Sequence, residues 1–346
     1  MTDRHSYLDR GVAEVRGLIT LDGRPERLFI ERQGDDERMR VGARLVAQVS
    51  VVEAALGSAF VDLGGGAQAI LDFKPDQRPI RGSALEVEVR GAPRSGKLAT
   101  VRAIGPADGK PRLLQAAPPL EDLLTSLLRG VRPAEGREAR EFADAAEAEA
   151  LETIHPLPGG GSLAIEVTRA LTAIDVDLGE RKNADAKRNA RHGNLVALGE
   201  AARLLRLKSI GGLVVVDLVG RGHDGAALLA AARLAFSPDN PGVAIGPIGR
   251  FGTMELSIPR RTPPLSELLC RPDGALSDRT LAHRLIRRVL AEGAAQPGAQ
   301  LVAMCAPAIA AAAGALSPAL AERIGARFIV IPQPEWRRDQ WDVVVR

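Results

Sequence analysis

Two runs of apolar residues in the middle of the chain each lead to an aspartate. Residues 213–216 precede Asp217, and residues 170–174 precede Asp175. Continuous apolar and β-branched runs of this length predict buried strands of a parallel or mixed sheet. Because open α/β sheets bind their ligands beyond the carboxyl ends of the strands, we expect both carboxylates to lie at one edge of a sheet.

The segment between the two runs has the pattern of a helix that packs on this sheet. Asn194 is a favourable residue for the N-cap, and Gly211 and Gly212 form a stop before the second strand. The apolar positions that recur at helical spacing are Leu195, Leu198, Ala202 and Leu205. Such a helix fixes the spacing of Asp175 and Asp217.

The N-terminal third has the pattern of a β-rich region. Short apolar or alternating segments fill residues 40–104, separated by Gly, Pro and charged turns, and this spacing predicts a small OB-like barrel. Before it, residues 14–33 predict two strands joined by a turn that contains Asp22 and Gly23, a favourable hairpin dipeptide.

The remaining segments predict a helix and a small α/β region. Residues 138–152 are acidic and rich in alanine, which favours a solvated helix. Residues 278–346 contain one amphipathic helix and three apolar strand-like runs, and Cys305 in one of those runs is expected in the core. The apolar face of that helix comprises Leu281, Leu285, Ile286, Val289 and Leu290.

The aspartates and the residues that follow them suggest chemistry at a polyanion. Carboxylate oxygens suit magnesium or manganese, which usually take one or two carboxylates together with waters and substrate phosphates. The basic residues after Asp175 are placed to contact phosphates. Two alternatives stay open: each aspartate merely caps a turn or helix, and the basic segment is a solvated face. The basic residues are Arg181, Lys182, Lys187, Arg188 and Arg191.

Three ordered blocks, residues 159–177, 193–219 and 248–260, resemble the catalytic region of the ribonuclease E/G family of bacterial endoribonucleases. The resemblance implies that Asp175 and Asp217 hold a magnesium ion that activates water for attack on single-stranded RNA. The expected products carry a 5′-phosphate and a 3′-hydroxyl. The family usually has asparagine at the position of Asp177, and this extra carboxylate tightens metal binding, acts as a third ligand or marks an altered activity.

The same resemblance assigns roles to residues around the aspartates. Asn194 matches a family position that borders the active site, and Arg250 matches one in the third block and is expected to contact phosphate. Phe251 and Glu255 match as well, and either they take part in the site or they brace it.

Residues 49–73 resemble the RNA-binding barrel of that family. Phe60 and Lys97 match positions that contact RNA, whereas Ile70 stands where a second aromatic is expected. Because base stacking on an aromatic contributes about 1–3 kcal/mol per base, we expect this barrel to bind single-stranded RNA more weakly than the barrels of the family do. Two alternatives stay open, namely that Phe60 belongs to the barrel core and that Lys97 is an exposed hairpin charge.

Two departures from the family pattern lead to further expectations. The arginine–threonine pair that recognises a 5′-monophosphate is missing, and Gly242 occupies the position of the other sensor arginine, so little 5′-end preference is expected. The family's zinc-linking Cys-x-x-Cys is represented by Cys270 alone. Because a structural zinc site needs four ligands, we expect no structural zinc and no zinc-linked assembly, which leaves a monomer or a homodimer.

The predicted fold class is therefore α/β (α+β), with an inserted OB-like barrel and an RNase H-like remnant. The expected organisation is an N-terminal hairpin packed on the catalytic core, the barrel, a shortened connecting or RNase H-like segment, the catalytic domain and a small α/β domain. Their ranges are 1–38, 39–104, 105–158, 159–265 and 278–346.

Composition agrees with a cytoplasmic RNA-processing protein. The 346 residues carry a net charge of only +3, so any nucleic-acid surface must be a local patch. The N-terminus lacks the apolar core of a signal peptide, and we find no apolar span of 18 residues. The sequence thus predicts a divalent-metal-dependent endoribonuclease for single-stranded RNA, and the alternative is a weak or inactive RNA-binding relative.

Overall fold

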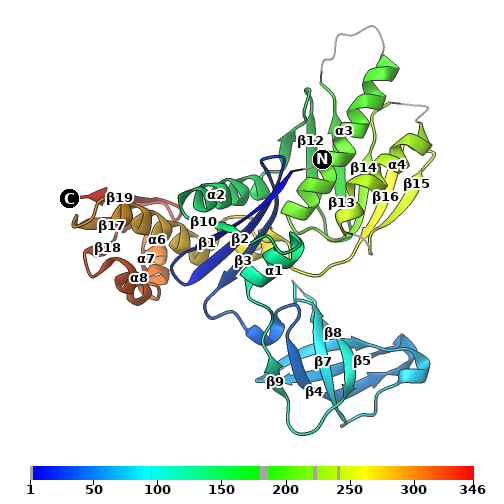
Figure 1. Cartoon of the computed structure of the whole chain (residues 1–346), viewed down its shortest axis with the longest axis horizontal. Helices are drawn as coiled ribbons and strands as arrows, with labels where there is room; N and C mark the ends of the chain where they lie inside the picture. Colours follow the sequence, from blue (N-terminus) through cyan, green and yellow to red (C-terminus); the bar gives the residue numbers. More distant parts are fainter. Residues whose placement is uncertain (1–2, 95, 180–185, 221–223, 240–241) are drawn as a thin grey trace.

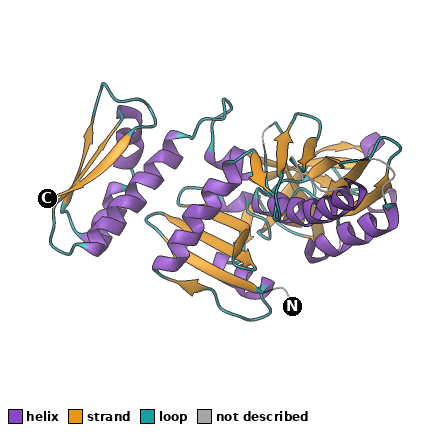
Figure 2. Ribbon diagram, turned by 90° about the horizontal axis from the view of Figure 1, so that it is seen from above, coloured by secondary structure: helices purple, strands orange, loops and turns teal. Residues whose placement is uncertain are grey.

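The computed structural model of the chain describes residues 3–94, 96–179, 186–220, 224–239 and 242–346. It is a mixed α/β structure with four sheets. The barrel lies at the lower right of Figure 1, and the N-terminal sheet lies between the C-terminal module (residues 278–346) and the sheet that carries the aspartates (Figures 1 and 2).

The two aspartates lie in a mixed sheet that we call the aspartate sheet, with strand order β11-β12-β13-β14-β16-β15. Its parallel pair, within the described residues, is β13 with β14, and helix α3 (Ala186–Leu207) connects them. Helices α3 and α4 (Gly225–Ala235) supply the core of one face. The strands are β11 (Ile154–Pro156), β12 (Ser162–Val167), β13 (Thr172–Asp177), β14 (Gly212–Asp217), β15 (Ala244–Ile248) and β16 (Thr253–Ile258).

The opposite face of the aspartate sheet, which we call the open face, is exposed. Along β13 and β14 buried and exposed residues alternate, and the Leu213 side chain is 44% exposed although Val214 is fully buried. The predicted strands are therefore buried on one face and exposed on the other. An apolar run does not show whether helices cover one face of its strand or both. In this sheet the helices cover one face.

The N-terminal sheet contains the predicted hairpin. Strands β2 (Glu14–Leu21) and β3 (Arg24–Arg32) meet at Asp22 and Gly23, whose positive φ values of 50° and 75° suit a tight hairpin turn. A further strand, β1 (Arg4–Arg10), was not predicted, and β10 (Ala134–Glu135) pairs with it in parallel. Helices α1 (Leu120–Leu127) and α2 (Arg137–Leu151) pack on this sheet.

The barrel is closed and has five strands, as the OB-like pattern predicted. The order β5-β6-β8-β7-β4 is closed by pairing of β4 with β5, and β9 (Arg112–Gln115) pairs with β4 in addition. Alternate residues of each strand fill the interior. The five strands are β4 (Arg44–Glu53), β5 (Ser58–Gly64), β6 (Ala67–Asp72), β7 (Ala84–Gly91) and β8 (Ala99–Pro106).

The C-terminal module, residues 278–346, consists of a three-stranded sheet in the order β18-β17-β19 and helices that cover one face of it (Figure 2). The predicted helix and strands are present, and Cys305 is fully buried, as predicted. The elements are α6 (Asp278–Ala295), β17 (Leu301–Cys305), α7 (Pro307–Gly314), α8 (Ser317–Ile324), β18 (Phe328–Pro332) and β19 (Trp341–Val345).

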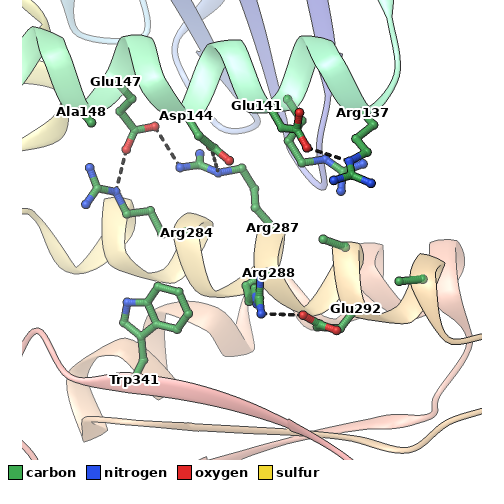
Figure 3. A pocket seen from close by; sticks show the side chains of 13 residues that line it. Arg137, Glu141, Asp144, Glu147, Ala148, Arg284, Arg287, Arg288, Glu292 and Trp341 are labelled. Carbon is green, nitrogen blue, oxygen red and sulfur yellow. Dashed lines mark hydrogen bonds and ion pairs between the residues drawn. The ribbon is translucent and has the colours of Figure 1, made fainter.

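Helix α2 is not the solvated helix that its composition predicted. Glu147 is 1% exposed and lies between the N-terminal sheet and α6. It binds Arg16 of β2, and it binds Arg284 and Arg287 of α6 (Figure 3). Burial alone raises the pKa of Glu147, but the three guanidinium groups outweigh it and hold that pKa below its usual value. The glutamate thus helps to join three segments that are distant in sequence.

Candidate functional site

Asp175 and Asp217 are direct partners across the parallel pair of the aspartate sheet. Neighbouring strands lie about 4.8 Å apart, and residues paired in this way point to the same face. Both side chains are exposed on the open face, and Asp217 is the last residue of its strand. The structure therefore brings the two carboxylates together at the carboxyl end of the parallel pair, where the sequence predicted them.

Asp177 lies two residues beyond Asp175, on the same face and at the end of β13. Its Oδ1 accepts a hydrogen bond of 2.8 Å from the backbone N–H of Gly179, which closes a turn. Over the described parts of the chain, no group of three or more His, Cys, Asp or Glu residues is arranged to hold a metal ion. The third-ligand role of Asp177 stays a prediction.

Asn194 does not cap a helix, because α3 begins at Ala186 and places it on an interior turn. Its fully buried amide donates to the carbonyl of Val219 at 2.9 Å and accepts from the N–H of Val219 at 3.0 Å. The helix is thereby tied to the segment that follows Asp217. Next to it, a Cβ on Gly193 would lie 2.3 Å from Leu178, so glycine permits the close approach of α3 to the chain after β13.

The predicted basic segment is described only in part. Arg181 and Lys182, and the side chain of Lys187, lie outside the described residues. Arg188 is exposed. Arg191 pairs with Asp224, the N-cap of α4, at 2.9 Å, and both side chains are largely exposed. An exposed pair of this kind contributes little to stability, so a phosphate is able to compete for the guanidinium.

The tip of the β15–β16 hairpin lies beside the aspartates. Asp217 pairs with Thr253, and the N–H of Leu218 donates to the carbonyl of Gly252 at 3.3 Å. At this tip the guanidinium of Arg250 stacks on Phe251, 4.6 Å from the ring centroid, and Phe251 is 77% exposed. An open depression of about 750 Å³ is lined by residues 220, 225, 226, 229 and 247–252. The predicted phosphate contact Arg250 is thus placed close to Asp217.

Glu255 is exposed on the open face, on the strand next to that of Asp217. Its register partner is Val215, two residues before the aspartate. Glu255 therefore adds negative charge to the same face as the two aspartates.

The model of the Ribonuclease E/G family matches residues 140–261, which include both aspartates, Asn194 and Arg250. The chain belongs to the ribonuclease E/G family. It is 35% identical to ribonuclease E of Haemophilus influenzae over 160 residues, which are 44% of this chain and 17% of that protein. It is 30% identical to ribonuclease E of Escherichia coli over 203 residues, which are 54% of this chain and 19% of that protein.

Similarity extends to ribonuclease G of Salmonella typhimurium, which is 27% identical over 213 residues, 57% of this chain and 43% of that protein. The aligned part thus spans less than half the length of each of these three curated relatives. No helix in the described parts of this family member is long and apolar enough to cross a bilayer.

The barrel of this ribonuclease E/G family member carries Phe60 on its outer surface. The interior side chains of β5 are Ala59, Val61 and Leu63, and Phe60 alternates with them, so the alternative of a core position was wrong. Phe60 pairs with Ile70 of β6, the position at which the family pattern has an aromatic. The two residues therefore lie side by side, as a pair of base-contacting residues would.

Lys97 is exposed at the tip of the β7–β8 hairpin, where its backbone pairs with that of Arg94. The β7–β8 hairpin also joins the barrel to the matched region, because the N–H of Ala92 donates to the carbonyl of Arg261 at 2.8 Å. Arg261 follows β16 at the end where that strand pairs with the start of β14. The contact therefore lies at the opposite end of β14 from Asp217, about 20 Å away at 3.3 Å per residue.

The two cysteines are free thiols in separate places. Cys270 is half-buried at the C-terminus of α5 (Leu265–Leu269), and Cys305 is in the core of the C-terminal module. Burial raises the pKa of both thiols. In the absence of a metal ion, both cysteines therefore favour the neutral thiol.

One exposed feature of the barrel was not predicted from the sequence, a groove between β4 and residues 78–81. Its sequence, Arg-Pro-Ile-Arg, reads as a turn because of the proline. The groove could have been predicted from the isoleucine between two arginines in this turn. A large apolar side chain in a charged loop is expected to remain exposed, because the neighbouring charged residues keep the loop at the surface.

Proposed function

We propose that this protein is an endoribonuclease that hydrolyses single-stranded RNA with a divalent metal ion held by Asp175 and Asp217. The observation that carries the proposal is their direct pairing on the open face at the carboxyl end of the parallel strands. Two adjacent carboxylates fit magnesium or manganese, which take one or two such ligands and keep several waters. A cation bound there would neutralise phosphodiester charge and lower the pKa of water.

The surrounding side chains would position the RNA. Arg250 at the hairpin tip and Arg188 and Arg191 at the start of α3 would supply positive charge around the aspartates. Arg181, Lys182 and Lys187 belong to the same basic segment of the sequence and would add to this charge. Such contacts carry no base specificity but fix the position of the backbone. Asn194 would hold the segment after Asp217 against α3 and so keep that carboxylate beside Asp175.

The barrel would bind single strands through Phe60, Ile70 and Lys97. A preference for 5′-monophosphorylated ends is not part of the proposal. At the sensor position, a Cβ on Gly242 would lie 2.7 Å from the ring of Pro259, so an arginine there would meet the chain after β16. The role we propose is RNA processing or decay in the cytoplasm.

The alternative is an RNA-binding relative with weak or no catalysis. One observation favours it, which is that Asp177 stands in place of the family's asparagine and uses its carboxylate in a turn with Gly179. An acid at this position adds negative charge where the substrate phosphate must approach. The two proposals differ in whether the aspartate pair is needed for cutting.

The test is cleavage of an end-labelled, unstructured A/U-rich RNA in Mg²⁺, Mn²⁺ or EDTA by the wild type, Asp175→Asn and Asp217→Asn. Asp342→Asn, an exposed aspartate in the C-terminal module, is the matched control for loss of one carboxylate. Metal-dependent cutting that both site variants lose and the control keeps supports the endoribonuclease. Binding without cutting, unchanged by either substitution, supports the RNA-binding alternative.

A further inference from the structure

An open groove of about 510 Å³ lies on the outside of the barrel between β4 and the loop before β7. Its apolar residues are unusually exposed, with Ile80 at 77% and Val51 at 42%. Because about three quarters of the Ile80 surface is in water, packing within this chain stabilises the side chain little. The residues that line the groove are Val51, Val52, Arg78, Pro79, Ile80 and Arg81.

The groove is continuous with the outer surface that carries Phe60. Val51 on β4 pairs with Phe60 on β5, and Phe60 pairs with Ile70 on β6. None of the three belongs to the barrel core. They therefore form one apolar row across three strands, and the row leads at Val51 into the groove.

Two arginines make this groove attractive to an anion. Arg78 and Arg81 are both exposed, and neither forms an ion pair or side-chain hydrogen bond within the described residues. Elsewhere on the barrel, Arg44 pairs with Glu86, and Arg90 and Arg102 pair with Glu88. Glutamates thus neutralise these strand arginines of the barrel, whereas Arg78 and Arg81 in the groove are available to bind an anion.

Apolar surface beside unpaired arginines has the chemistry of a single-stranded nucleic-acid track. Bases stack or pack on flat and apolar side chains, while guanidinium groups bind the phosphates between them. A purely protein partner would also require shape complementarity over a larger area than this loop offers. An RNA strand bound along this row would extend from Ile70 over Phe60 to Val51 and into the groove.

We propose that the groove at residues 78–81 is a second RNA subsite that extends the Phe60 surface, an inference that rests on the proposed function above. Arg78 and Arg81 bind two phosphates, and Val51, Pro79 and Ile80 contact the intervening base. The subsite offsets part of the affinity lost by having Ile70 in place of an aromatic.

The test is fluorescence anisotropy of the full chain with a labelled 15-nucleotide oligouridylate in EDTA, titrated between 50 and 300 mM KCl. Removing two phosphate contacts in Arg78→Gln/Arg81→Gln is expected to reduce the slope of log K against log salt by about 1.4 and to raise Kd about 25-fold at 0.1 M salt. Ile80→Ser is expected to raise Kd several-fold and to leave the slope unchanged, because it removes only an apolar contact.

The matched control is Arg129→Gln/Arg132→Gln, which removes the same charge at the same spacing from two exposed arginines outside the barrel. Its Kd and slope are expected to stay within twofold of the wild type. If the groove variant behaves like this control while wild-type RNA binding and aspartate-dependent cutting persist, the subsite is refuted and the proposed function stands. Absence of RNA binding in the wild type overturns both.

Discussion

Replacing Glu147 by glutamine is expected to destabilise the contact between the C-terminal module and the N-terminal sheet. Around this residue, buried guanidinium and carboxylate groups are equal in number, so each charge is compensated. The guanidinium groups belong to Arg16, Arg32 and Arg287, and the carboxylates to Asp9, Glu14 and Glu147.

The magnitude follows from what Glu147 contacts. It accepts from Arg287 Nη2 at 2.9 Å and from Arg284 Nε at 2.7 Å, and lies 3.4 Å from Arg16 Nη1. The Arg16 side chain is 0% exposed and that of Arg287 is 8% exposed, so water cannot replace the lost carboxylate. Breaking a buried ion pair by removing one partner costs about 3–5 kcal/mol. Because Arg16 and Arg287 keep other acidic partners, we expect about 3 kcal/mol.

The assay is urea unfolding followed by tryptophan fluorescence, because both tryptophans of the chain, Trp336 and Trp341, lie in the C-terminal module. Trp341 also lines the groove between α2 and α6 in which Glu147 lies, so its signal reports directly on this contact (Figure 3). The matched control is Glu141→Gln on the same helix, whose pair with Arg137 is exposed. Because that pair is exposed to water, the control is expected to unfold at nearly the same urea concentration as the wild type.

Equal unfolding midpoints for Glu147→Gln and Glu141→Gln would show that the Glu147 carboxylate does not stabilise this contact. A loss below about 1 kcal/mol would mean that the arginines find other partners or water on substitution. A loss seen in circular dichroism but not in tryptophan fluorescence would place the effect elsewhere than at the C-terminal module.

The remaining predictions concern acid stability and RNA affinity. Burial raises the pKa of Glu14, but Arg287, Arg32 and His283 outweigh it and lower that pKa to about 2. The resulting stabilisation, about 3 kcal/mol, is present above pH 4.5 and is lost as the pH falls from 4.5 toward 2. Burial lowers the pKa of His283 to about 4. Because this histidine takes up its proton more readily in the unfolded chain, the free energy of unfolding also falls as the pH drops from 6.5 to 4. Urea midpoints that stay constant between pH 7 and 3 would contradict both statements. On the barrel, Ile70→Phe is expected to strengthen oligouridylate binding by about 1–3 kcal/mol, because it adds a stacking platform beside Phe60. Unchanged anisotropy curves would show that bases do not reach this surface.

The sequence alone determined most of what depends on local pattern. The turn at Asp22 and Gly23, the barrel strands and the apolar face of α6 lie where periodicity and turn residues predicted them. Each of these follows from conformational preferences of residues close in the chain. The strand runs that lead to Asp175 and Asp217 were found in the same way.

The tertiary structure decided which residues meet. Pairing of Asp175 with Asp217 depends on the register of two strands joined by a helix, and a shift by one residue would move one carboxylate to the covered face. Asn194 has the composition of a cap, yet its partner is Val219, 25 residues away. Glu147 has the composition of solvated surface, yet arginines from β2 and α6 enclose it.

The physical reason for this difference is that the burial of a side chain depends on the segments that pack around it, and not on the residue type alone. An alternating strand such as β5 shows that one face is interior, and only closure of the barrel shows that Ala59 lies inside and Phe60 outside. A carboxylate is stable in the interior only when cations from other segments compensate its charge. The chain's local patterns thus fixed its elements, while non-local pairing and charge compensation fixed the site and the contact that holds the C-terminal module.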